Sequence, residues 1–197
     1  MLEQAAREIT SDYELATLLI EGGDKLVTDD ATRAAYLSAA KTLQSDYEQG
    51  RVLTSLVKRG SISPALLAGV LETSIDLGSD YEAAQLLTLI AERQAITGSI
   101  RQAFFAAVDG IKSGYEKGRV LQALLKRTDL PSEVVVDAID AAATIGGYEA
   151  GQVLQTAART QSISGAARDA YVRAAGGLGE YEQGQALAAL VRNERRK

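Results

Sequence analysis

Apolar residues recur along this chain with the spacing of amphipathic helices. In the segment 46–59, apolar and small residues cover well over half of a helical wheel. The remaining polar stripe is narrow and consists of Glu48, Arg51, Ser55, Lys58 and Arg59. A helix with so little polar surface must be covered on several sides. Nowhere does the pattern show the period of two that is typical of a strand. The sequence therefore predicts an all-α protein in which each helix packs against several others.

The predicted helices come in pairs that follow one another along the chain. The first helix of a pair occupies segments such as 46–59, 80–93 and 114–127. The second helix follows a short turn, and its start signals are Asp29-Asp30, Ser63-Pro64, Thr97-Gly98, Leu130-Pro131-Ser132 and Ser164-Gly165. A capping serine followed by proline is typical of a first helical turn. Because glycine is the usual residue after a helix, we expect the second helices to end near Gly78, Gly146 and Gly179.

One tetrad, Ser45-Asp46-Tyr47-Glu48, marks the start of the first helix in each pair. It recurs at 11–14, 79–82 and, slightly changed, at 113–116, and two worn copies follow at 147–149 and 180–182. The tyrosines are separated by 34, 34, 34, 33 and 33 residues; they are Tyr13, Tyr47, Tyr81, Tyr115, Tyr148 and Tyr181. A fixed period of this length is the signature of a solenoid. We predict a right-handed α-solenoid of about six helix-pair repeats of 33–34 residues, forming one domain over 1–197. The repeats start near residues 11, 45, 79, 113, 147 and 180, after a partial leading helix in 1–10.

Each tetrad has the form of a capping box. The serine side chain is expected to accept from a backbone N–H of the first turn, and the glutamate to reach back to the serine N–H. The acidic residues also suit the positive end of the helix dipole. Tyrosine contributes nothing to a cap, so we interpret the six tyrosines as packed anchors of the core. The alternative is that they form a recognition ladder.

A second column of residues lies three positions after the tyrosines. Its members are Ala16, Gly50, Ala84, Gly118, Gly151 and Gly184. Glycine inside a helix costs about 1 kcal/mol relative to alanine. Its repeated use indicates a close contact with a neighbouring repeat, and we expect the neighbour's tyrosine ring to lie against this column.

Composition excludes several classes of function. The chain has 197 residues, no cysteine, no histidine and a formal net charge of −5. It therefore has no disulfide, no thiolate and no imidazole ligand, and its charge disfavours nucleic-acid binding. No apolar run approaches the roughly 18 residues that span a bilayer, and residues 1–8 lack a signal-peptide pattern. As written, the chain is expected to be cytoplasmic, without cofactor or direct membrane insertion. If it was excised from a larger membrane-anchored protein, the localisation stays open.

Charged residues gather at both ends of the predicted first helices. The N-terminal edge carries a possible partner-binding row of carboxylates formed by Glu14, Glu48, Glu82, Glu116, Glu149 and Glu182. Such a row could recruit a basic partner or divalent cations, but helix capping already accounts for it, and we favour that interpretation. The opposite edge carries basic residues that suit helix C-termini; they are Lys58, Arg59, Arg93, Lys126, Arg127, Arg159 and Arg192. Tyr36, Phe104 and Tyr171 align with Val70 in the second helices, which indicates packing.

The run Ser45-Asp46-Tyr47-Glu48-Gln49-Gly50-Arg51-Val52-Leu53 resembles the SDYE-type, HEAT-like helical repeats of bacterial proteins. The resemblance covers nearly the whole chain as six copies, and the next best match is the segment 115–121. Such arrays form accessory regions of membrane-anchored metallopeptidase-like and sensor proteins. The peptidase part of those proteins needs a zinc motif with histidines, so the resemblance implies only the accessory array.

The leading hypothesis for function is a non-enzymatic scaffold that presents a surface for protein or peptide binding. One alternative is a structural or regulatory spacer array cut from a larger bacterial membrane-associated protein. Another is an engineered repeat protein without a natural ligand. The last predicted helix has no second helix after it, so Ala186, Leu187, Leu190 and Val191 should lack part of their cover. We predict that this face either associates end to end with another copy or marks an excision from a longer protein.

Overall fold

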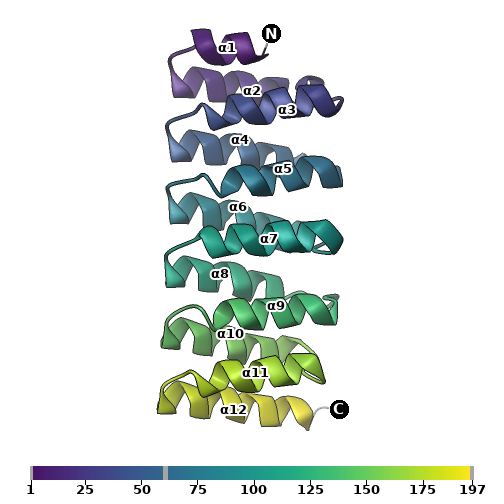
Figure 1. Cartoon of the computed structure of the whole chain (residues 1–197), viewed down its shortest axis with the longest axis vertical. Helices are drawn as coiled ribbons and strands as arrows, with labels where there is room; N and C mark the ends of the chain where they lie inside the picture. The colour runs from purple at the N-terminus through teal and green to yellow at the C-terminus, as the bar shows by residue number, and fades with distance from the viewer. Residues whose placement is uncertain (1, 60–61, 196–197) are drawn as a thin grey trace. The chain divides into compact units, whose positions relative to one another are not determined.

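The computed structural model describes residues 2–59 and 62–195, and the regular secondary structure within these ranges is helical (Figure 1). The helices are α1 (Leu2–Glu8), α2 (Asp12–Leu26), α3 (Asp30–Lys41), α4 (Asp46–Lys58), α5 (Pro64–Ser74), α6 (Asp80–Arg93), α7 (Gly98–Gly110), α8 (Gly114–Leu125), α9 (Ser132–Ala142), α10 (Gly147–Thr160), α11 (Ala166–Gly176) and α12 (Glu180–Glu194).

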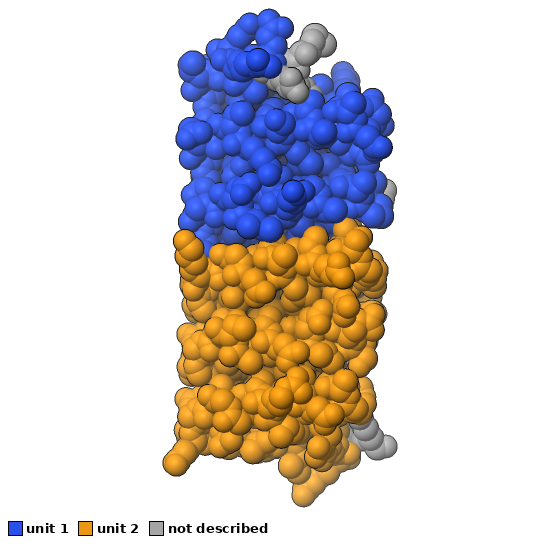
Figure 2. Space-filling view, in the orientation of Figure 1, with its two compact units in different colours: residues 1–90 blue, residues 91–197 orange. Residues whose placement is uncertain are grey.

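The chain divides into two compact units, residues 1–90 and residues 91–197, which Figure 2 shows in different colours. In unit 1, α2 packs on α4 in one layer, and α1, α3 and α5 pack in sequence in the other. In unit 2, α8, α10 and α12 form one layer and α7, α9 and α11 the other. Each unit is thus a two-layered stack in which helices contact their neighbours. This confirms the all-α repeat architecture, whereas the right-handed twist and the single domain over 1–197 stay predictions.

The core of each stack lies between its two layers. In α4 the side chains of Val52, Leu53 and Leu56 are buried, and in the adjoining α5 so are those of Leu67 and Val70. Removing apolar surface from water at about 25 cal/mol per Å² is the main favourable contribution to such a core.

The second helices begin where the sequence predicts. Asp29 caps α3 in a full capping box with Thr32, and Ser63 caps α5 with Pro64 in the first turn. Gly98 and Gly165, at the starts of α7 and α11, have φ of +56° and +53°, a conformation that L-residues with a side chain rarely adopt.

The predicted ends of the second helices are wrong. Three of these helices, α5, α9 and α11, end at Ser74, Ala142 and Gly176. Their C-cap residues stay in the right-handed helical region, so no left-handed glycine is needed. Gly146 and Gly179 instead precede α10 and α12 as N-cap residues, with φ near −60°.

Candidate functional site

The six repeated tyrosines lie on the surface, so their interpretation as core anchors is wrong. Their exposed fractions are 62% for Tyr13, 59% for Tyr47, 51% for Tyr81, 63% for Tyr115, 65% for Tyr148 and 74% for Tyr181. The helical period explains the outcome: Arg51 lies one turn after Tyr47 on the same side, whereas the buried Val52, Leu53 and Leu56 lie on the opposite side. We call Tyr13, Tyr47 and Tyr81 the unit 1 tyrosine row, and Tyr115, Tyr148 and Tyr181 the unit 2 tyrosine row.

The buried aromatic residues are those of the second helices, as predicted. Tyr36, Phe104 and Tyr171 are fully buried. The hydroxyl of Tyr36 donates to the carbonyl of Leu19 at 2.9 Å, and that of Tyr171 donates to the carbonyl of Ala186 at 2.8 Å. Burial raises the pKa of Tyr36 to about 12 and also raises the pKa of Tyr171. These tyrosines therefore tie the two helical layers together.

A guanidinium group lies between two rings of the unit 1 row. The central carbon of the Arg51 guanidinium is 5.8 Å from the ring centroid of Tyr13 and 5.8 Å from that of Tyr47. Its Nη1 atom is 2.5 Å from Oε2 of Glu48, one turn earlier in the same helix. Distances below about 6 Å to an aromatic centroid are typical of cation–π interactions. Two successive rings and the glutamate between them therefore form a slot that holds a cation.

The residue at the position of Arg51 differs between repeats. Four positions after the tyrosines the chain carries Thr17, Arg51, Gln85, Arg119, Gln152 and Gln185. Arg119 forms an ion pair with Glu116 at 2.7 Å, as Arg51 does with Glu48. Gln85 donates instead to the hydroxyl of Tyr81 at 2.9 Å.

The column of small residues makes the predicted close contact, but with the glutamates of the next tetrad. A Cβ atom added to Gly50 would lie 3.2 Å from Oε2 of Glu82, and one added to Gly151 would lie 3.3 Å from Cβ of Glu182. The nearest atom to a Cβ on Gly118 would be Cβ of Glu149, at 3.5 Å. The suggestion that a tyrosine ring covers this column is therefore wrong.

The other three members of the column are found in two different environments. Ala16 and Ala84 are fully buried. Gly184, in α12, has nothing within 4 Å of an added Cβ and is exposed. The contact with the next glutamate is thus seen at Gly50, Gly118 and Gly151.

The glutamates do not form a free acidic edge. The side chains of Glu48 and Glu116 are only 11% and 13% exposed, and each is paired with an arginine of its own helix. Burial and the nearby charge of Asp46 raise the pKa of Glu82. Glu14 is exposed, whereas Glu149 and Glu182 are half-buried. In the described parts of the chain, no group of three or more acidic side chains is arranged to hold a metal ion.

The reciprocal half of the predicted capping box is replaced by a bond between repeats. Ser45 accepts from the N–H of Glu48, as predicted, but its own N–H donates to Oδ2 of Asp12 at 2.7 Å. The same carboxylate accepts from the N–H of Gln44 at 2.9 Å. In the next repeat, Asp46 accepts from the N–H of Gly78, also at 2.9 Å. The aspartates therefore fix the loop that begins the following tetrad, and with it the spacing of the tyrosines.

Polar side chains near the C-terminal ends of the first helices form hydrogen bonds with the preceding first helix. Gln161 donates to the carbonyl of Leu125 at 2.6 Å, and Asn193 donates to the carbonyl of Ala158 at 2.9 Å. Arg59 and Arg127, predicted to suit helix C-termini, donate to carbonyls of the preceding first helix in the same way. The sequence gives no local sign of these bonds, because donor and acceptor are more than 30 residues apart.

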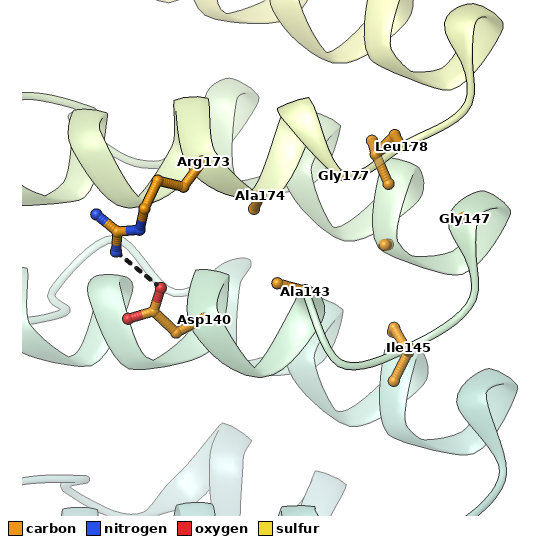
Figure 3. A pocket seen from close by; sticks show the side chains of 9 residues that line it. Asp140, Ala143, Ile145, Gly147, Arg173, Ala174, Gly177 and Leu178 are labelled. Carbon is orange, nitrogen blue, oxygen red and sulfur yellow. Dashed lines mark hydrogen bonds and ion pairs between the residues drawn. The ribbon is translucent and has the colours of Figure 1, made fainter.

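A small hollow lies in unit 2, between the C-terminal parts of α9 and α11 (Figure 3). Its volume is about 170 Å³, and an ion pair of 3.2 Å between Arg173 and Asp140 borders it. Sites for small molecules usually enclose about 300–1,000 Å³. The hollow is too small for such a ligand, and both charged side chains are more than half exposed.

Of the four α12 residues that were predicted to lack part of their cover, only two are exposed. Leu187 and Val191 are 37% and 46% exposed, but Ala186 and Leu190 are buried against α10 and α11.

Among the described residues, no helix has the length and apolar character needed to cross a membrane. No family model matches the chain, and comparison with curated proteins and with solved structures gives no match either.

Proposed function

We propose that the chain is a non-enzymatic helical-repeat scaffold and that its rows of exposed tyrosines bind peptide segments of partner proteins. The observation that carries this proposal is the exposure of all six repeated rings. The serines cap helices, the aspartates fix loops and the glutamates pack on the small-residue column. The exposed tyrosine rings take part in none of these three contacts.

Exposed tyrosine is well suited to binding. It offers a large amphipathic surface while losing the freedom of only two side-chain torsions, and it is enriched among the residues that dominate protein interfaces. Each tyrosine is the second residue of its helix. The helix starts after a capping serine, as in α4, or after a glycine, as in α10, and its buried face is packed. The rows therefore present rings at fixed positions on rigid elements, which lowers the entropic cost of binding.

A peptide library displayed on phage tests the proposal. The library is selected on the immobilised full chain and on a variant in which Tyr47, Tyr115 and Tyr148 are all changed to alanine. Because the rings are exposed, we expect the variant to keep the circular dichroism of the parent and to lose the enriched peptides.

The matched control changes Ile75 and Val172 to alanine, since both are exposed apolar residues that are not members of the rows. It should retain the same peptides. Peptides that bind the parent and the triple tyrosine variant equally well would refute the proposal.

A further inference from the structure

The slot of unit 1 shows what kind of group fits between two successive rings. Arg51 places its guanidinium at equal distances from Tyr13 and Tyr47, and Glu48 holds it there. The chain thus carries its own example of a ligand for a tyrosine row, namely a planar cation between two aromatic rings and beside a carboxylate.

The two slots between the rings of the unit 2 tyrosine row keep the rings and the glutamates of this arrangement, but neither has an arginine at the position of Arg51. Gln152 and Gln185 occupy the positions equivalent to Arg51, and Glu149 and Glu182 those equivalent to Glu48. A neutral glutamine supplies no charge to pair with the glutamate. Arg119 and Glu116 form such a pair in α8, whereas the glutamates of the two slots, Glu149 and Glu182, lie in α10 and α12.

The spacing of the row selects the form of a ligand that fills two slots at once. The helices α8, α10 and α12 pack side by side, and packed helices lie about 8–10 Å apart. A polyproline II peptide has three residues per turn and rises about 3.1 Å per residue, so residues i and i+3 point the same way and lie about 9 Å apart. Two arginines separated by two residues match two neighbouring slots.

We propose that the unit 2 tyrosine row binds an extended basic peptide of the form Arg-x-x-Arg. One guanidinium enters between Tyr115 and Tyr148 beside Glu149, and the other enters between Tyr148 and Tyr181 beside Glu182. This inference rests on the proposed function and adds the chemistry of the partner. The net charge of −5 favours the approach of a basic peptide.

Fluorescence anisotropy with the full chain tests the inference. The probe is a labelled Arg-Pro-Pro-Arg-Pro-Pro peptide, and the comparison peptide, Arg-Arg-Pro-Pro-Pro-Pro, has the same composition with the arginines adjacent. We expect the spaced peptide to bind at least tenfold more tightly. Equal affinity for the two peptides would overturn the inference, because it would show attraction by charge alone.

The decisive variant changes Gln152 and Gln185 to arginine, so that the chain's own guanidinium groups occupy both slots. Arginine occurs naturally at the equivalent positions 51 and 119, so the variant should fold. We expect at least a tenfold loss of affinity for the spaced peptide. A control with the same added charge, Gln102→Arg with Ala106→Arg, changes exposed positions of α7 in the other layer and should bind within twofold of the parent.

The outcomes separate this inference from the proposed function. If both double variants bind the spaced peptide equally, the arginine slots are wrong. If the library peptides depend on the tyrosines but carry no spaced arginines, the inference fails and the proposed function stands. If no peptide depends on the tyrosines, both fail.

Discussion

Leucine at Gly118 and leucine at Gly184 should have opposite effects on stability. Both glycines are the fifth residue of a first helix in unit 2, and leucine is the better helix former by about 0.8–1 kcal/mol at each position. At Gly184 an added Cβ meets nothing within 4 Å, so the propensity gain should appear as stabilisation. At Gly118 a Cβ would lie 3.5 Å from Cβ of Glu149 and 3.7 Å from Cδ1 of Ile145. A full leucine side chain must displace these neighbours, and overpacking of this kind costs about 1–3 kcal/mol.

The two variants should therefore differ by about 1–3 kcal/mol in the free energy of unfolding, because the propensity terms cancel. For a chain of this length each kcal/mol corresponds to about 2–4 °C in Tm. Urea and thermal unfolding followed by circular dichroism measure the difference. Alanine supplies the internal control: at both positions it adds only a Cβ, which fits, so Gly118→Ala and Gly184→Ala should both be stabilising. Stabilisation by Gly118→Leu as large as that by Gly184→Leu would refute the packing of glutamate on the glycine column.

Three further predictions concern unit 1. Asp12→Ala removes the acceptor of two backbone N–H groups and should cost about 1–3 kcal/mol; faster hydrogen exchange at the amides of Gln44 and Ser45 would localise the effect, and unchanged exchange would argue against the bond. Tyr36→Phe should make unfolding less sensitive to alkali: the pKa of Tyr36 is raised to about 12, above its ordinary value of about 10, so the neutral phenol stabilises the fold at lower pH and this contribution is lost as the pH rises from about 10 to 12. Tyr81→Ala should change the free energy of unfolding by no more than about 0.5 kcal/mol, as is usual for surface positions; a loss of several kcal/mol in chemical denaturation would return this tyrosine to the core.

Much of the architecture can be predicted from the sequence because the helix start signals are local and recur in several repeats. The period of the tyrosines, the serine caps and the Ser63-Pro64 start all report on residues within one turn of each other. The contact at Gly50 is predictable for a different reason, since repeated glycine inside a helix has a cost that only packing explains.

The tyrosine surface is not predicted because ring size and repetition suggest burial. Tyr47 lies at the margin of the apolar arc, and its neighbour one turn later is Arg51, a position that varies between repeats. That pairing with a variable polar position is the signal that indicates exposure. The bonds from Asp12 to Ser45 and from Asn193 to Ala158 join residues more than 30 positions apart. Helix patterning contains no information about such pairs, so only the folded chain reveals them.

Because glutamate packs on glycine in the same way at successive repeats of unit 2, a repeat could also pack against a duplicate of itself. The segment 147–179 offers Glu149 to Gly118 on one side and Gly151 to Glu182 on the other. If recombination duplicated this segment in tandem, the new junction would place Glu149 of the second copy on Gly151 of the first. That junction would have the same chemistry as the one now made by Glu182. Such a duplication would add one exposed ring and one slot without designing a new interface, so the length of the tyrosine row is a quantity that evolution can change in single steps of 33 residues.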